Sequence, residues 1–172
     1  MVKVPKPCPQ GFQQFGSSCY YFKSVGGSAL SWDQARTKCR SLSADLVSIE
    51  TKEEHEFIKK NLKPITTPNI FQGWYVGGKR RTVDPATGRP WTAAQNANKA
   101  EMKKQYYWVA TGKTMAYDGW EKSKADIPNV QPVGDPCVLL WVGRSDFLDY
   151  EFDDYVCASN YPNIGYVCEK TN

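Results

Sequence analysis

Aromatic residues are interspersed with polar ones at the start of the chain, between Cys8 and Phe22. Phe12, Phe15 and Tyr20 are separated by polar positions and by the turn residues Gly16-Ser17-Ser18. Short strands show such a pattern because successive side chains point to opposite faces. This segment is therefore predicted to form a β-hairpin.

Two stretches with helical periodicity follow. The apolar residues of the first recur at i, i+3, i+7 and i+10, at Trp32, Ala35, Cys39 and Leu42. Ser31 with Gln34 is a capping-box signature, so a helix from about Trp32 to Leu42 is predicted.

Thr51 with Glu54 opens a second helix, predicted from about Lys52 to Leu62. Its inward face would carry His55, Ile58 and Leu62. The four residues 46–49 between the helices are predicted to form a short strand.

The rest of the chain alternates apolar runs with long irregular stretches. Strands are predicted at 74–78, 106–109, 138–141 and 165–168, with loops at about 79–104 and 118–136. Loops of this length are usually functional. A hairpin, two helices and then separated strands predict an α+β fold. No linker divides the 172 residues, so one domain over 1–172 is expected, with residues 1–7 as a tail.

Six cysteines occur, an even number, without the C-x-x-C or Cys/His clustering typical of zinc sites. This predicts three disulfides and a secreted, extracellular protein, because disulfides persist in oxidising compartments. Six cysteines allow 15 pairings, and their spacing leaves the choice among them open.

Positive charge is concentrated in one segment. Residues 79–104 hold seven basic and two acidic residues, a net +5, whereas the whole chain carries only +4. A solvated surface loop is favoured over a site for an anionic partner. No nucleic-acid partner is expected, and no membrane span, because the apolar runs are too short to cross a bilayer.

No catalytic constellation is present in the sequence. His55 is the only histidine, and no nucleophile elbow, zinc-binding helix motif or phosphate-binding loop accompanies it. We expect a binding module with no catalytic residues and not an enzyme.

Several motifs in order resemble the C-type lectin-like domain family over Cys8 to Cys168. They are the cysteine order, Trp74-Tyr75-Val76-Gly77-Gly78, the Trp108 turn leading to Trp120, and Phe152-Asp153-Asp154 before Cys157. The resemblance implies a fold of two helices packed on antiparallel sheets, and the disulfides Cys8–Cys19, Cys39–Cys168 and Cys137–Cys157.

Sugar-binding members of that family hold a calcium ion on the long loop. Matched position by position, the resemblance implies the calcium ligands Asn129, Asp135, Asp153 and Asp154. It implies glycan contacts from Asn129, Asp135, Asp153 and Tyr155, and a cis peptide bond before Pro128.

Two positions depart from the family motif. Asp153 stands where the family usually has Asn, which adds a charge and removes an amide donor. Ile127 stands where the family has Glu or Gln, which removes one ligand; Asp126 beside it is a replacement if the loop shifts by one residue.

The resemblance therefore implies a secreted, calcium-dependent lectin that recognises mono- or oligosaccharides, with a role in innate immunity. Weak single sites would favour a homo-oligomer. The alternative is a calcium-independent domain of the same fold that binds a protein, a mineral or an anionic polymer through the basic insertion 79–104.

Overall fold

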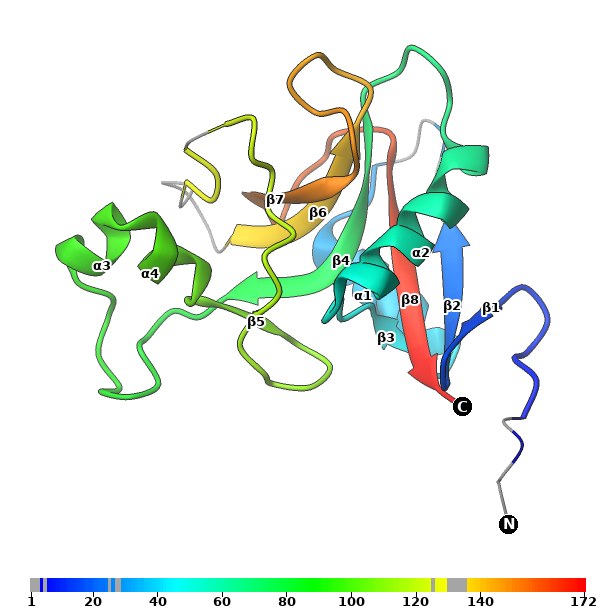
Figure 1. Cartoon of the computed structure of the whole chain (residues 1–172), viewed down its shortest axis with the longest axis horizontal. Coiled ribbons are helices and arrows are strands. Elements are labelled where there is room, and N and C mark those ends of the chain that lie inside the picture. Colours follow the sequence, from blue (N-terminus) through cyan, green and yellow to red (C-terminus); the bar gives the residue numbers. More distant parts are fainter. Residues whose placement is uncertain (1–3, 5, 25, 27–28, 125, 130–135) are drawn as a thin grey trace.

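The computed structural model describes residues 4, 6–24, 26, 29–124, 126–129 and 136–172. Its architecture is the predicted α+β fold, a mixed β-sheet with helices packed on it (Figure 1). The strands are β1 (Gln13–Phe15), β2 (Ser18–Lys23), β3 (Asp45–Leu46), β4 (Gln72–Arg80), β5 (Tyr106–Trp108), β6 (Pro136–Val142), β7 (Glu151–Val156) and β8 (Ile164–Thr171). The helices are α1 (Trp32–Ser41), α2 (Lys52–Leu62), α3 (Ala93–Ala97) and α4 (Lys99–Lys103), and a 3-10 turn, Lys63–Ile65, extends α2.

The strands described form one sheet in the order β1-β2-β8-β4-β6-β7, with β3 added to β8 and β5 added to β4. The β4–β8 pair is parallel, and the other ladders are antiparallel. Strand β7 therefore lies at one edge of the sheet. Described residues of the long loop, of the β6–β7 loop and of the β7–β8 loop gather beside β6 and β7.

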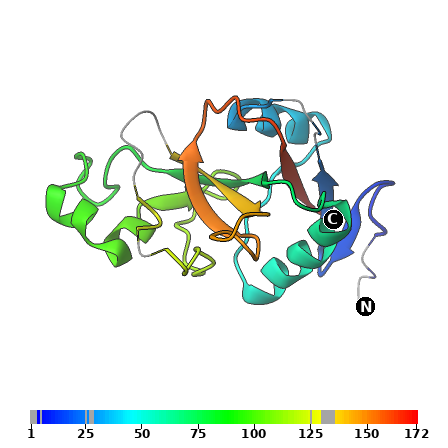
Figure 2. The same cartoon turned by 90° about the horizontal axis from the view of Figure 1, so that it is seen from above.

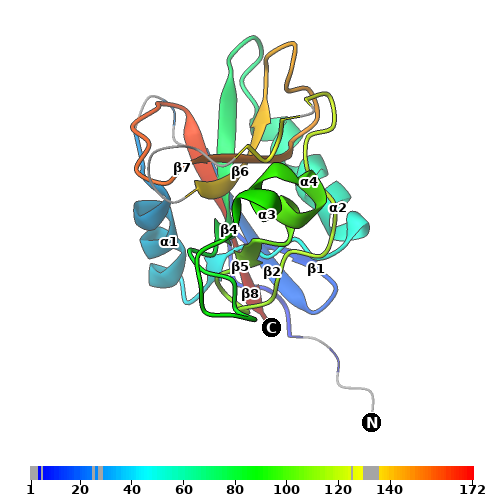
Figure 3. The same cartoon turned by 90° about the vertical axis from the view of Figure 1, so that its left-hand side faces the viewer.

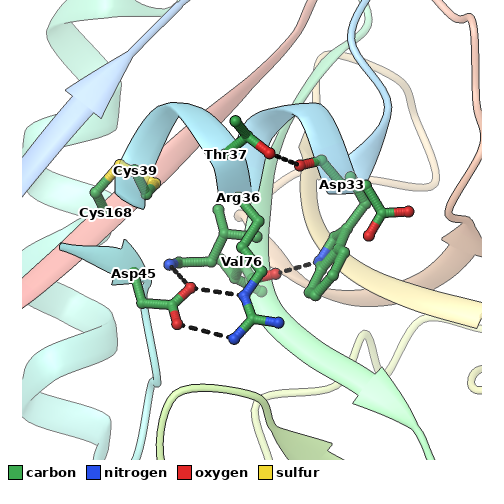
Figure 4. A network of polar contacts seen from close by, with 9 residues as sticks. Asp33, Arg36, Thr37, Cys39, Asp45, Val76 and Cys168 are labelled. Carbon is green, nitrogen blue, oxygen red and sulfur yellow. Dashed lines mark hydrogen bonds and ion pairs between the residues drawn. A yellow bond between two sulfur atoms is a disulfide. The ribbon is translucent and has the colours of Figure 1, made fainter. Parts of the chain in front are cut away.

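Helix α1 lies on one side of the strands and α2 on the other (Figure 3). The predicted capping box opens α1, since the Ser31 side chain accepts from the Gln34 backbone and the Gln34 side chain accepts from the Ser31 backbone. Trp32 donates its indole N–H to the Val76 carbonyl at 2.8 Å, which joins α1 to β4. Arg36 forms a two-point ion pair with Asp45 of β3 (Figure 4).

Helix α2 follows its predicted bounds, and Thr51 caps its first turn by accepting from the Glu54 N–H. His55, Ile58 and Leu62 are 1%, 0% and 0% exposed, so the predicted inward face is confirmed. The His55 ring stacks on Phe152 and contacts the Tyr150 carbonyl at 2.7 Å. His55 is a core residue.

Three disulfides connect the chain in the pairing that the family resemblance implies. They are Cys8–Cys19, Cys39–Cys168 and Cys137–Cys157. The second joins α1 to β8 across 129 residues (Figure 4). No helix among the described residues is long and apolar enough to span a bilayer.

Two local predictions were wrong. The strand predicted at 46–49 is only Asp45–Leu46. Val47 makes one backbone hydrogen bond to Val167 and one to Gly77, which does not extend the ladder. Residues 47 and 49 are apolar because they are buried in the core. The insertion 79–104 was predicted to be a loop but holds α3 and α4. Thr92 with Gln95 forms a capping box there, and Asn98 accepts from the Glu101 N–H.

Candidate functional site

A cleft of about 340 Å³ opens at the β7 edge of the sheet. Seen from above, β6 and β7 lie between the insertion helices on one side and α1 with β8 on the other (Figure 2). The residues that line the cleft come from both strands and from loops far apart in the sequence: Phe71, Lys124, Asp126, Ile127, Asn129, Trp141, Arg144, Phe147, Asp153, Asp154, Tyr155 and Tyr161.

Aromatic rings gather around Trp141 in this cleft. Phe71 stacks on the indole at 4.3 Å between ring centroids, while Tyr155 and Tyr161 contact it edge-on at 5.3 and 5.8 Å. Trp141 is buried and the two tyrosines are half-exposed. The cluster therefore offers solvent two hydroxyl-bearing rings fixed against a buried indole.

Basic side chains border the aromatic cluster. The Arg144 guanidinium lies over Phe71 at 4.6 Å and over Phe147 at 5.2 Å, and Lys124 lies over Phe147 at 5.0 Å. Both cations also pair with Asp146. These contacts fix the loop between β6 and β7 beside the cleft.

Asp153 lies in the same cleft with 9% of its surface exposed. Burial, and secondarily the neighbouring Asp154 carboxylate, raises its pKa to about 7, while a hydrogen bond with the Trp141 side chain acts in the opposite direction. Near neutral pH the carboxyl is therefore present in both protonation states. It can accept hydrogen bonds in either state, and donate one when protonated.

Asp154 points to the other face of β7, as expected for the next residue of a strand. It is 1% exposed, and its two oxygens accept from the Tyr106 hydroxyl at 3.1 Å and from the Asn129 backbone N–H at 3.0 Å. Asp154 thereby ties β5 and the long loop to β7.

The structure brings together Asn129, Asp153, Asp154 and Tyr155, four of the residues that the sequence predicted for the site. Asp135, the fifth, lies outside the described residues. The Ile127–Pro128 bond is cis, as the resemblance implied. The neighbouring aromatic residues Phe71 and Tyr161 were missed, because no periodic or motif signal links these two loop positions to the triplet on β7.

The described part of the predicted calcium set does not fit that ion well. Calcium takes six to eight oxygen ligands. Both Asp154 oxygens are engaged by protein donors, burial disfavours the charged form of Asp153, and Ile127 brings no side-chain oxygen. Within the part of the chain that is described, no group of three Asp, Glu, His or Cys side chains is suited to a metal ion. With Asp135 undescribed, calcium binding stays a prediction.

Two arginines of the basic insertion, Arg80 and Arg81, are engaged in contacts within the protein. Arg80 donates to Gln105 at 2.7 Å and to Asn96 at 3.0 Å. Arg81 donates to the Gly112 carbonyl at 2.7 Å, and its guanidinium lies over the Tyr107 ring at 4.3 Å. Arg80 thereby ties α3 to β4, and Arg81 packs on β5, which favours the β7 cleft as the site for ligand binding.

Comparison with known proteins agrees with this architecture. Ladderlectin of Oncorhynchus mykiss is 27% identical over 157 residues, 91% of this chain and 65% of ladderlectin, so the chain spans just under two thirds of that relative. The solved structure of the SPL-1–GlcNAc complex covers 95% of this chain, which covers 94% of it, with a TM-score of 0.64 at 22% identity. The calcium-independent lectin SPL-2 from Saxidomus purpuratus gives a TM-score of 0.61 at 22% identity, with coverages of 95% and 93%.

The family model described as "Lectin C-type domain" matches residues 28–170, most of the chain. The fold and the disulfide pairing agree with that match. The chain therefore belongs to the C-type lectin domain family, which makes it a binding module and not an enzyme.

Proposed function

We propose that this chain is an extracellular glycan-binding protein and that a saccharide lies in the β7 cleft. The observation that carries the proposal is the combination of half-exposed Tyr155 and Tyr161 with the polar groups of Asp153 and Asn129 in one concave site. Small-ligand sites are typically concave, mostly apolar and equipped with a few polar groups that fix orientation. SPL-1, a protein of the same fold, was solved with GlcNAc.

The chemistry of the cleft matches that of a pyranose. The faces of aromatic rings are electron-rich, so they attract the C–H groups on the apolar face of a sugar. Asp153 and Asn129 supply acceptors and donors for the hydroxyl groups. Three disulfides and the relationship to ladderlectin support a secreted protein, and recognition of microbial glycans is the role in innate immunity that we propose.

Calcium dependence is a separate part of the proposal. The side chains that the structure describes in the cleft favour glycan binding without a metal ion. SPL-2 is a calcium-independent member of the same fold. Each measurement below is therefore made once with calcium and once with chelator. Equal affinity in both supports direct binding, and loss in chelator restores the calcium-dependent lectin that the sequence predicted.

Replacing Tyr155 or Tyr161 with Ala is expected to weaken binding of the best glycan-array ligand by about tenfold, or ~1.4 kcal/mol. Each replacement removes a half-exposed ring that packs on Trp141 without emptying the core. The measurement is titration calorimetry of the purified variants with that glycan.

Tyr107→Ala is the matched control, because Tyr107 is also a half-exposed tyrosine but packs against Arg81 of the insertion. It should bind like the wild type. Binding that survives both cleft variants and is lost in Tyr107→Ala would move the site to the basic insertion, the alternative that the sequence left open.

A further inference from the structure

Lys99, at the start of α4, connects the insertion to the candidate site. Its ammonium donates to the Asp126 carbonyl at 2.8 Å and to the Pro128 carbonyl at 2.6 Å. Both carbonyls belong to the long loop, and Asp126, Ile127 and Asn129 line the cleft. A cation carried by the chain itself therefore binds the segment that forms one wall of the cleft.

Lys99 lies on helix α4, which is fixed to the rest of the protein by contacts of its own. Asn98 caps α4, and Met102 on the same helix is 3% exposed. Upstream of α4, Asn96 accepts from Arg80 of β4 at 3.0 Å and from Gln105 at 3.0 Å. The backbone at Lys99 is therefore fixed by contacts other than those with the long loop. The position of its ammonium does not depend on the long loop alone.

The long-loop segment 126–129 is held at two points. Lys99 binds its carbonyls from the side of the insertion, and Asp154 of β7 accepts the Asn129 N–H at 3.0 Å. Carbonyl oxygens are ligands that hard cations take in proteins. An ammonium can satisfy them equally well, because it offers three donors and a full positive charge.

We propose that Lys99 is a positioning residue: its ammonium holds residues 126–129 in place and so keeps the wall of the cleft ordered without a bound metal ion. The effect on glycan affinity rests on the function proposed above, whereas the effect on loop order does not. The basic insertion then stabilises the binding site, and the ammonium of Lys99 binds acceptors within the protein.

Hydrogen exchange of the Asn129 amide tests this directly. In Lys99→Met, which keeps the length of the side chain but removes its charge, the Asn129 amide should exchange at least about tenfold faster than in the wild type. Amides of β4 and β6 should keep their protection, which separates loosening of the loop from loss of the fold. Lys99→Arg should restore most of the protection, because a guanidinium also donates to both carbonyls.

Lys104→Met is the control, since Lys104 follows α4, is exposed and pairs with Glu101. It should match the wild type. Unchanged Asn129 exchange in Lys99→Met overturns the proposal, as does an unprotected Asn129 amide in the wild type. Faster exchange of the wild type in chelator would also overturn it, because a metal ion would then be ordering the loop.

Glycan affinity gives a second readout. It should fall at least about fivefold in Lys99→Met and stay unchanged in Lys104→Met. If the wild type binds no glycan, the function proposed for the cleft fails, while the exchange data still decide the role of Lys99. If Lys99→Met binds like the wild type although exchange is faster, Lys99 orders the loop as proposed, and the result contradicts only a part for this loop in glycan recognition.

Discussion

Replacing Cys39 and Cys168 together with Ala is expected to lower the free energy of unfolding by about 5 kcal/mol. The disulfide joins α1 to β8 across 129 residues, and in the chain-entropy model the constraint on the unfolded chain grows with the size of the closed loop. Both residues are fully buried, so the variant also loses contacts in the core. Urea denaturation of the two proteins at pH 7.5 measures the difference.

The Cys8–Cys19 disulfide provides the comparison within the same chain. It closes only 11 residues and pins the N-terminal hairpin, so its replacement by two Ala should lower the free energy of unfolding by about 3 kcal/mol. An equal loss in the two variants would argue that local packing, and not constraint of the unfolded chain, governs the stability these bonds provide.

The elements that sequence reasoning located correctly are those with local signals. Helices α1 and α2 were predicted because Ser31 and Thr51 are N-cap residues and because the apolar residues of both helices repeat with helical spacing. Strand β3 was overestimated because residues 46–49 are apolar for burial in the core and not for a ladder. Helices α3 and α4 are five residues each, too short for a periodic pattern to develop.

Only part of the candidate site could be predicted from the sequence. Asp153, Asp154 and Tyr155 are consecutive and precede a cysteine, so motif reasoning found them together. That reasoning made both acids calcium ligands, whereas strand geometry directs Asp154 toward Tyr106 and leaves Asp153 beside Trp141. The alternation of a strand separates side chains that the linear sequence places side by side.

The contacts of the basic insertion with distant segments could not be inferred from one sequence. Lys99 lies 27 and 29 positions from the carbonyls it binds, and nothing in its neighbourhood distinguishes it from Lys103 or Lys104. The high charge of the insertion favoured a solvated surface loop, with an external anionic partner as the alternative. In the folded chain Arg80, Arg81 and Lys99 instead bind acceptors of the protein itself.

Lowering the pH from 6.5 to 4 is expected to remove about 3 kcal/mol of stability through His55 alone. Burial between α2 and Phe152 lowers the pKa of His55 from 6.5 to about 4, so the folded state holds the ring neutral where the unfolded chain would already bind a proton. The stability contributed by the neutral ring is complete above pH 6.5 and is lost as the pH falls toward 4.

Asp153 acts in the opposite direction, and this determines how the His55 effect must be measured. Its pKa is raised to about 7, so its carboxyl favours the folded state at low pH and loses that contribution as the pH rises from about 4 to 7. The wild-type pH profile is the sum of two opposed slopes, and on its own it reports neither group. The informative quantity is the difference in unfolding free energy between the wild type and His55→Gln, measured by urea denaturation in chelator at pH 7.5 and pH 4.

We expect His55→Gln to be less stable than the wild type at pH 7.5, because it loses the ring that stacks on Phe152 at 5.0 Å. By pH 4 that difference should have narrowed by about 3 kcal/mol, since only the wild type has a buried histidine to protonate. Asp153→Asn is the matched control: its stability relative to the wild type should rise, and not fall, as the pH is raised over the same range. Parallel pH profiles for the wild type and His55→Gln would show that the ring is protonated equally easily in the folded and unfolded states. The prediction of a buried neutral histidine would then be wrong.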